Sequence, residues 1–346
     1  MSKLIAPWEP AAQAFAPAEV LGSKFLNTVP TSLMGGAKAP RMIRRLLLER
    51  RRGDPKKPIG PFRTDTSVYG TPSLQGLRVT WMGHSTLLLE IDGMTILTDP
   101  VWSERASFVS FAGPKRFYPP TLALKDLPPL DAVLLSHDHY DHLDRPTIEQ
   151  LAVLQKNDRT RFIASLGFRS DLESWGIAPQ KITELNWGQS TSLGSDRSIT
   201  ATPARHFSGR RLWGRNQTLW SSFVISGATH NIFFGGDSGM FPGFRAIGDA
   251  YGPFDLTMLE IGAYDADWSD IHMGPIHAAQ AHLDLRGKLL LPIHWGLFNL
   301  AFHPWQEPIE RLMNVAAEKN ISLFLPFPGA AHDVTGENLQ TFWWEL

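Results

Sequence analysis

The densest group of chemistry-bearing residues in the chain is the segment 136–144, Ser-His-Asp-His-Tyr-Asp-His-Leu-Asp, which follows directly on an apolar run. Histidines two positions apart cannot share one face of a helix, so a loop at the end of a strand must present them. His137 and His139 can then converge on one cation, while Asp141 and His142 face a second. A chance cluster of surface histidines is the alternative.

Three more side chains of the metal-ligand type stand at the ends of strand-like runs elsewhere in the chain. His206 follows residues 198–205, Asp237 follows 232–236, and His294 follows 289–293. Imidazole and carboxylate ligands without thiolate suit zinc, with iron or manganese as alternatives. Each of these residues can instead be structural. If they are ligands, one ion takes His137, His139, His206 and Asp237, and the other takes Asp141, His142, His294 and the same bridging Asp237.

The elements that must position these residues begin at about residue 76 and are mostly short and β-rich. Strands are predicted at 78–82, 86–91, 94–98, 131–136, 161–165, 198–202, 220–225, 231–234, 255–261, 289–293 and 322–327. Helices are predicted at 146–155, 168–175, 275–285 and 305–319. Strands outnumber helices in both halves, which indicates a layered sandwich with outer helices.

The first 75 residues differ from the rest because prolines repeatedly interrupt them. One amphipathic helix is predicted at 41–52, and residues 41–57 carry a net charge of +6 against −7 for the remainder. We expect an N-terminal Pro-rich extension, 1–75, whose basic helix packs on a main domain, 76–346. Attraction of its arginines to anionic lipid or to a phosphorylated substrate is the alternative.

Composition narrows the class of protein. Apolar residues make up 43% of the 346 residues and charged residues 19%, which excludes global disorder. A net charge of −1 argues against a nucleic-acid partner, and the lack of cysteine excludes disulfides, thiolate metal sites and cysteine nucleophiles. No apolar run approaches the ~20 residues that span a bilayer, and the N-terminus lacks the pattern of a signal peptide. We expect a cytoplasmic protein, with peripheral membrane contact left open.

The loop His-x-His-x-Asp-His, with a later His, Asp and His each after a strand, resembles the metallo-β-lactamase superfamily. More narrowly, the chain is similar to the family of phospholipases D that hydrolyse N-acylphosphatidylethanolamine. The resemblance implies an α/β fold, a four-layer αβ/βα sandwich of two mixed sheets with outer helices, and two zinc ions at one edge. It covers about residues 76–300 and rests on the histidine loop together with 77–86, 97–100, 113–117, 234–239, 252–256, 261–264 and 293–296.

The resemblance also implies roles for individual residues and the same division of ligands between two ions. Asp99 and His84 are expected behind the ligands, although Asp99 can equally form a turn before Pro100 and His84 a buried turn. His272 is expected beside the metals as a catalytic group together with Asp237; capping of a helix start is its alternative role.

The sequence also suggests which substrate the site binds and which residues contact it. Two divalent ions, two carboxylates and a bridging hydroxide leave a charge of about +1, which suits a phosphodiester. Loop arginines are often merely solvated, and aromatic residues after Asp99 can line an acyl-chain groove or fill space beneath their loop. The candidate substrate contacts are Arg210, Arg211, Arg215 and Tyr140, and the aromatic residues are Trp102, Phe108, Phe111, Phe117 and Tyr118.

Three functional hypotheses follow. The first is a dinuclear zinc phosphodiesterase that cleaves N-acylphosphatidylethanolamine, or a related lipid phosphodiester, through a hydroxide bridging the metals. The second is a lactonase, or another ester or amide hydrolase of the same fold. The third is a metal-bearing binding or regulatory protein that is not an enzyme. The Gly-Asp-Ser-Gly stretch at 236–239 imitates a serine-protease motif, but its Asp is better used as a metal bridge.

Overall fold

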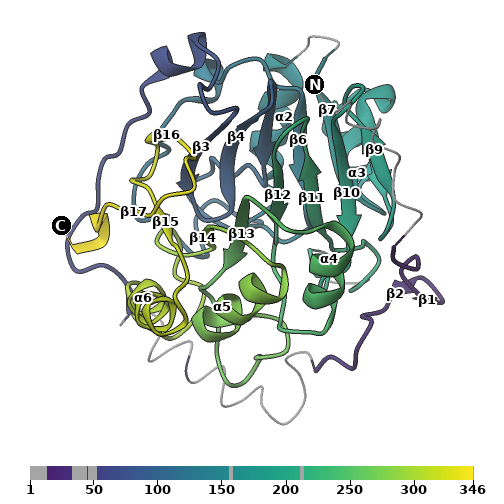
Figure 1. The fold of residues 1–346 in the computed structure, drawn as a ribbon. Helices are drawn as coiled ribbons and strands as arrows, with labels where there is room; N and C mark the ends of the chain where they lie inside the picture. The colour runs from purple at the N-terminus through teal and green to yellow at the C-terminus, as the bar shows by residue number, and fades with distance from the viewer. Residues whose placement is uncertain (1–13, 33–44, 46–52, 156–158, 211–213, 346) are drawn as a thin grey trace, which may run out of the picture.

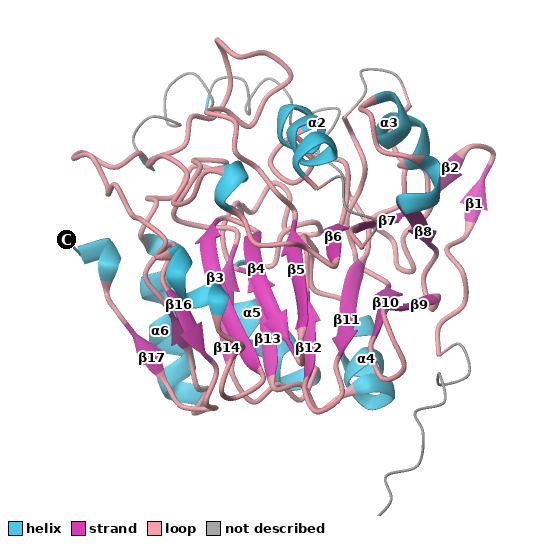
Figure 2. Cartoon of the chain, turned by 90° about the horizontal axis from the view of Figure 1, so that it is seen from above, coloured by secondary structure: helices cyan, strands magenta, loops and turns pink. Residues whose placement is uncertain are grey.

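Two β-sheets packed face to face form the centre of the computed structural model, and helices cover their outer faces (Figures 1 and 2). The structure describes residues 14–32, 45, 53–155, 159–210 and 214–345. Helices α2 and α3 lie on one outer face and α4, α5 and α6 on the other (Figure 2). The expected four-layer αβ/βα sandwich is therefore confirmed.

The strands of the first sheet run in the order β16-β3-β4-β5-β6-β7-β8, antiparallel from β16 to β5 and parallel from β5 to β8. The second sheet has the order β14-β13-β12-β11-β10-β9, parallel from β14 to β12 and antiparallel from β12 to β9. Two smaller pairs are β1-β2 and β15-β17. The strand bounds are β1 (Val20–Leu21), β2 (Lys24–Phe25), β3 (Leu77–Gly83), β4 (Thr86–Ile91), β5 (Met94–Thr98), β6 (Ala132–Leu135), β7 (Arg161–Ser165), β8 (Ile182–Leu185), β9 (Ser190–Ser192), β10 (Ser198–Thr202), β11 (Ser222–Ser226), β12 (Asn231–Phe234), β13 (Leu256–Glu260), β14 (Leu290–Ile293), β15 (Phe324–Leu325), β16 (Ala331–Asp333) and β17 (Leu339–Gln340).

The helices occupy the outer layers because the strands they cover are apolar on both faces. In β6, Ala132 and Leu134 enter the core between the sheets, while Val133 and Leu135 pack beneath α2 and α3. This alternation follows from the two-residue period of a strand. The helix bounds are α2 (Arg145–Leu154), α3 (Arg169–Ser174), α4 (Gly243–Tyr251), α5 (Gly274–Asp284) and α6 (Glu307–Lys319).

Several elements were missed by the sequence analysis. Helix α4 begins after Pro242 and contains glycines, which read as a loop. Gly248 is required there, because a Cβ would lie 2.2 Å from the carbonyl oxygen of Asp284 in α5. The short edge strands β8, β9 and β16 also escaped prediction, since three or four residues carry too little periodicity.

Some described residues of the N-terminal segment contact the sandwich. Phe62 contacts the rings of Tyr118 and Trp343 edge-on, and Asn27 hydrogen-bonds to the backbone of His206. Most of the predicted helix 41–52 lies outside the described residues. Within it, Arg45 forms ion pairs with Asp265 and Asp267.

Candidate metal centre

The metal-ligand candidates converge at one end of the sandwich, where strands of both sheets finish. The loop after β6 carries His137, His139, Asp141 and His142. The facing sheet supplies His206 after β10, Asp237 after β12, and His294 after β14. Because parallel strands end at the same edge, residues up to 157 positions apart in sequence meet there. The structure thus brings together all seven side chains predicted to bind metal.

The first group is a cluster of three imidazoles. Nδ1 of His139 lies 2.9 Å from Nε2 of His137 and 3.2 Å from Nε2 of His206. His137 and His206 are almost fully buried. Oδ2 of Asp237 lies 3.7 Å from the His137 nitrogen and 3.8 Å from that of His206. Ligand atoms of the four residues therefore lie within 4.8 Å of one another.

The second group gathers around the carboxylate of Asp141. Its Oδ2 lies 3.5 Å from Nε2 of His142, 3.2 Å from Nε2 of His294 and 2.9 Å from Nε2 of His84. These four residues also have ligand atoms within 4.8 Å of one another. His84, predicted behind the ligands, is thus in direct contact with Asp141.

Asp237 lies between the two groups. While Oδ2 faces the first group, Oδ1 lies 3.2 Å from Nε2 of His142, and Oδ2 is also 3.0 Å from Nε2 of His294. A single carboxylate therefore faces nitrogens of both groups, which is the geometry expected of a bridge.

The donor atoms fit divalent cations better than they fit one another. His139 Nδ1 faces two imidazole nitrogens, yet it can carry only one proton and so satisfy at most one of them. Nε2 of His142 and Oδ1 of Asp237 are buried without a hydrogen-bond partner among the described residues. In a tetrahedral zinc site with bonds of about 2.0–2.1 Å, ligand nitrogens stand about 3.3 Å apart. The spacing of the imidazoles in the first group is close to that value.

The electrostatics of the site favour cation binding. Burial lowers the pKa of His137 and of His206 well below the usual range, so both rings are neutral and keep a free lone pair. Burial also disfavours protonated His142, but Asp237 and Asp141 outweigh it and raise its pKa well above normal. The same balance, led by Asp237, raises the pKa of His294 to about 10. The carboxylates thus attract positive charge to this position, which a metal ion can supply.

Asp99 orients a ligand histidine from behind. Its Oδ2 accepts hydrogen bonds from Nδ1 of His142 at 2.7 Å and from the Ser136 hydroxyl, and its Oδ1 accepts one from the Ser136 backbone N–H. Carboxylates behind metal-bound imidazoles commonly fix the ring in this way. Asp99, His84 and His294 all have positive φ, at 33°, 55° and 62°, a region uncommon for residues other than glycine.

His272 lies beside the centre and contacts an acid that the sequence analysis missed. Its Nδ1 is 3.9 Å from Oδ2 of Asp237 and 2.6 Å from Oε2 of Glu260, the last residue of β13. Glu260 is fully buried, and burial raises its pKa. The only signal for it was one acid inside the mostly apolar run 256–261.

The three arginines predicted to contact substrate have different surroundings in the structure. Arg210 donates to the carbonyl oxygens of Asp138 and Leu143, and its guanidinium stacks 4.4 Å from the ring of Tyr140. These contacts favour a role in holding the histidine loop. Arg215 is exposed, and Arg211 lies outside the described residues.

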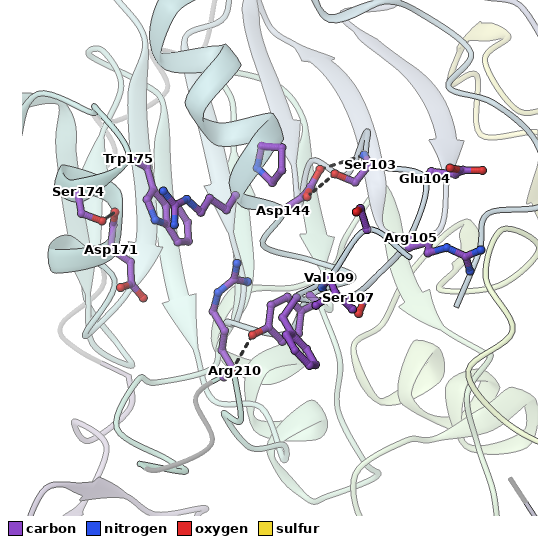
Figure 3. Close-up of a pocket in the computed structure, with 15 residues that line it drawn as sticks. Ser103, Glu104, Arg105, Ser107, Val109, Asp144, Asp171, Ser174, Trp175 and Arg210 are labelled. Atoms are coloured by element: carbon purple, nitrogen blue, oxygen red, sulfur yellow. Dashed lines mark hydrogen bonds between the residues drawn. The ribbon is translucent and has the colours of Figure 1, made fainter. Parts of the chain in front are cut away.

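A pocket of about 670 Å³ adjoins this loop (Figure 3). Tyr140, Arg210, Trp175 and Phe108 are among its lining residues, and none of the seven ligand candidates is. Tyr140 donates to the Arg210 carbonyl oxygen, while the residues on either side of it, His139 and Asp141, face the metal centre. The loop therefore separates the pocket from the centre.

Comparisons with known proteins agree with this fold and site. A family model described as a Beta-lactamase superfamily domain matches residues 94–295, more than half of the chain. Igni18, a metallo hydrolase from Ignicoccus hospitalis, superposes with a TM-score of 0.57 at 22% identity, covering 74% of this chain and 97% of its own. The chain belongs to the β-lactamase superfamily and is a metal-dependent hydrolase of the metallo-β-lactamase fold.

Two curated relatives narrow the position of the chain within that class. An N-acyl-phosphatidylethanolamine-hydrolyzing phospholipase D of Caenorhabditis elegans is 39% identical over 250 residues, 69% of this chain and 70% of the relative. An uncharacterized protein of Mycobacterium tuberculosis is 48% identical over 273 residues, 78% of this chain and 72% of the relative. The expected resemblance to the phospholipase D family is therefore confirmed.

A helix that crosses a bilayer needs about 20 consecutive, predominantly apolar residues. Among the helices of the described residues, none combines the length and the apolar character needed to cross a bilayer.

Proposed function

We propose that this chain is a dinuclear zinc phosphodiesterase that cleaves N-acylphosphatidylethanolamine or a related lipid phosphodiester. The observation that carries the proposal is the position of Asp237, whose carboxylate faces histidines of both groups. Iron or manganese would satisfy the same donors. In this proposal the first ion takes His137, His139, His206 and Asp237, and the second takes Asp141, His142, His294 and Asp237.

Divalent ions held there would lower the pKa of a coordinated water and stabilise negative charge on the phosphoryl group under attack. The chain supplies the arrangement around that event. Asp99 fixes His142, and His84 contacts the oxygen of Asp141 that also faces His142 and His294. His272 is partly exposed, with 13% of its side chain accessible, so it can reach an oxygen of the bound substrate.

The lipid part of the proposal is supported by exposed apolar side chains in the loop that follows Asp99. Phe108 and Phe111, in the loop after Asp99, are 76% and 81% exposed, whereas Tyr118 is buried. The ring of Phe108 lies 6.1 Å from that of Tyr140, inside the histidine loop. Exposed apolar side chains beside a site often mark contact with an apolar ligand or surface. The name of the Caenorhabditis elegans relative supports the same substrate class.

The proposal extends to the organisation and location of the protein. We assign residues 1–75 to an extension packed on the hydrolase domain 76–346, supported by the contacts of Asn27 and Phe62. We also propose a cytoplasmic location with peripheral membrane contact; the exposed Phe108 and Phe111 support only the membrane contact.

Metal analysis together with a rate assay tests the proposal. Zinc-loaded protein should hydrolyse N-acylphosphatidylethanolamine in mixed micelles faster than a lactone or a β-lactam. Asp237→Asn should lose most of its bound metal and its turnover, whereas Asp255→Asn, a control in which the acid pairs with Lys288 instead, should keep both. Faster lactone turnover would favour the lactonase hypothesis, and absence of turnover on every substrate would favour a binding protein. Full metal content in Asp237→Asn would contradict the bridge.

A further inference from the structure

Glu260 is the acid at the middle of the polar network behind the metal centre. It ends β13, in the sheet that also supplies His206, Asp237 and His294, and its side chain is inaccessible to solvent. A buried carboxylate is costly unless its oxygens are hydrogen-bonded, so its partners show what it does.

The two oxygens of Glu260 have different partners. Oε1 accepts hydrogen bonds from the backbone N–H of Ser238 at 3.0 Å and of Met273 at 3.1 Å. Ser238 follows Asp237 and Met273 follows His272, so this oxygen ties together the two loops that carry them. Oε2 lies 2.6 Å from Nδ1 of His272.

The contact with Oε2 decides how His272 can act. Oε1 accepts two backbone N–H groups, which favours the ionised form of Glu260 despite its burial. An ionised carboxylate only accepts hydrogen bonds, so Nδ1 of His272 carries the proton. Nε2 is the other ring nitrogen and is therefore the one left for the substrate. Without this contact, the ring could rotate about its side-chain bonds or take the other tautomer.

Direct ligation of a metal by Glu260 is the competing role. Ligand atoms of Glu260, Asp237, His272 and His294 do lie within 4.8 Å of one another. However, Oε1 is occupied by two backbone N–H groups and Oε2 by His272. His294 already faces Asp141 and Asp237 through Nε2, and only its Nδ1 approaches Glu260, at 3.9 Å.

We propose that Glu260 is a positioning residue that acts through His272, holding its Nδ1–H so that Nε2 faces the bound substrate. The inference rests on the proposed function only for the identity of the reaction. The orientation and tautomer of His272 follow from the contacts of Glu260, whatever the substrate is.

The first test needs no substitution. In zinc-loaded wild-type protein labelled with ¹⁵N, the His272 signals, assigned by their loss in His272→Ala, should show the proton on Nδ1. A proton on Nε2 alone would overturn the proposal, even if the phosphodiesterase function were correct. A protein with the expected tautomer but without phosphodiester turnover would contradict the proposed function and leave this inference standing.

The second test uses kinetics with bis(4-nitrophenyl) phosphate. Glu260→Gln should keep the zinc content of the wild type and lower kcat about 10-fold or more with little change in KM, as expected when support of a catalytic group is lost. In a His272→Ala background the same substitution should change kcat less than about twofold, because residues that act as a unit are not additive. An equal loss in both backgrounds, or loss of zinc from Glu260→Gln, would overturn the proposal.

Glu184→Gln is the matched control. Its Oε1 also accepts two backbone N–H groups, from Gly167 and Arg169, and its other oxygen pairs with Arg169 rather than with a histidine. It should lower stability while leaving kcat unchanged. A comparable loss of kcat in Glu184→Gln would show that a general loss of stability, and not His272, explains the effect.

Discussion

The substitution Asn27→Ala removes a contact between the N-terminal segment and one of the candidate ligands. The side-chain amide of Asn27 donates to the carbonyl oxygen of His206 at 2.8 Å and accepts from its N–H at 3.0 Å. His206 lies beyond the end of β10 and has no strand partner there, so Asn27 satisfies both of its backbone groups. The N–H of the Trp220 ring also reaches Asn27, but it keeps the carbonyl oxygen of Ala204 as a second partner.

The expected loss follows from these contacts. Leaving a buried donor or acceptor unpaired costs about 1–3 kcal/mol. Two backbone groups of His206 lose their partner, so the free energy of unfolding should fall by about 2–6 kcal/mol. Because the same groups hold the imidazole in place, zinc affinity should fall about 10- to 100-fold, as it does when the support of a ligand is removed.

Zinc affinity measured by competition with a chelator, together with denaturant unfolding of the metal-free protein, separates the two effects. Asn27→Asp should lose less of both, because it keeps the acceptor for the His206 N–H. Asn231→Ala is the control. Asn231 begins β12, and its side-chain amide donates to the carbonyl oxygen of Tyr251 at the end of α4, away from the candidate ligands. If Asn27→Ala and Asn231→Ala weaken zinc binding equally, or Asn27→Ala leaves it unchanged, the reasoning is refuted.

Three further substitutions test other parts of the structure. Asp99→Ala leaves Nδ1 of His142 without its acceptor, so zinc affinity should fall about 10- to 100-fold; unchanged affinity in a chelator titration would contradict its role. Burial lowers the pKa of His282 to about 4 from 6.5, so only the unfolded chain binds a proton between these values, and the free energy of unfolding should fall as the pH decreases, by on the order of 3 kcal/mol. Urea unfolding at pH 7 and pH 4 should show a smaller decrease for His282→Gln, and an equal decrease would refute the assignment. Arg210→Ala should lower the melting temperature, at a cost of about 2 kcal/mol, with kcat on a small phosphodiester nearly unchanged; a change confined to KM would instead indicate substrate contact.

The histidine loop could be predicted from the sequence because its signal is local. A strand of apolar residues and a loop with three histidines lie within a dozen positions, and Asp237 and His294 repeat the strand-then-ligand pattern. The layered fold followed from the same strands. The predicted metal-ligand assignment, although its residues lie together, stays a prediction until an ion is measured.

Other parts of the site had no local signal. Glu260 interrupts an apolar strand only once, and Asn27 meets His206 across 179 positions of sequence. The partners of such residues depend on how the two sheets pack, which the period of hydrophobic residues does not specify. Helix α4 had a local signal, but a wrong one: its glycines predicted a loop. The close contact of Gly248 with α5 overrides that local preference and keeps the segment helical.

The distribution of candidate ligands between the sheets has a consequence for assembly of the protein. Apart from β16, the first sheet is built from residues 77–185 and the second from residues 190–293. Ions bound by residues of both sheets would hold two successive stretches of the polypeptide together. At a free metal concentration 1,000 times its dissociation constant, each ion would add about 4 kcal/mol to the free energy of unfolding. Two polypeptides produced by division between β8 and β9 would then associate more tightly in the presence of zinc than after a chelator has removed it.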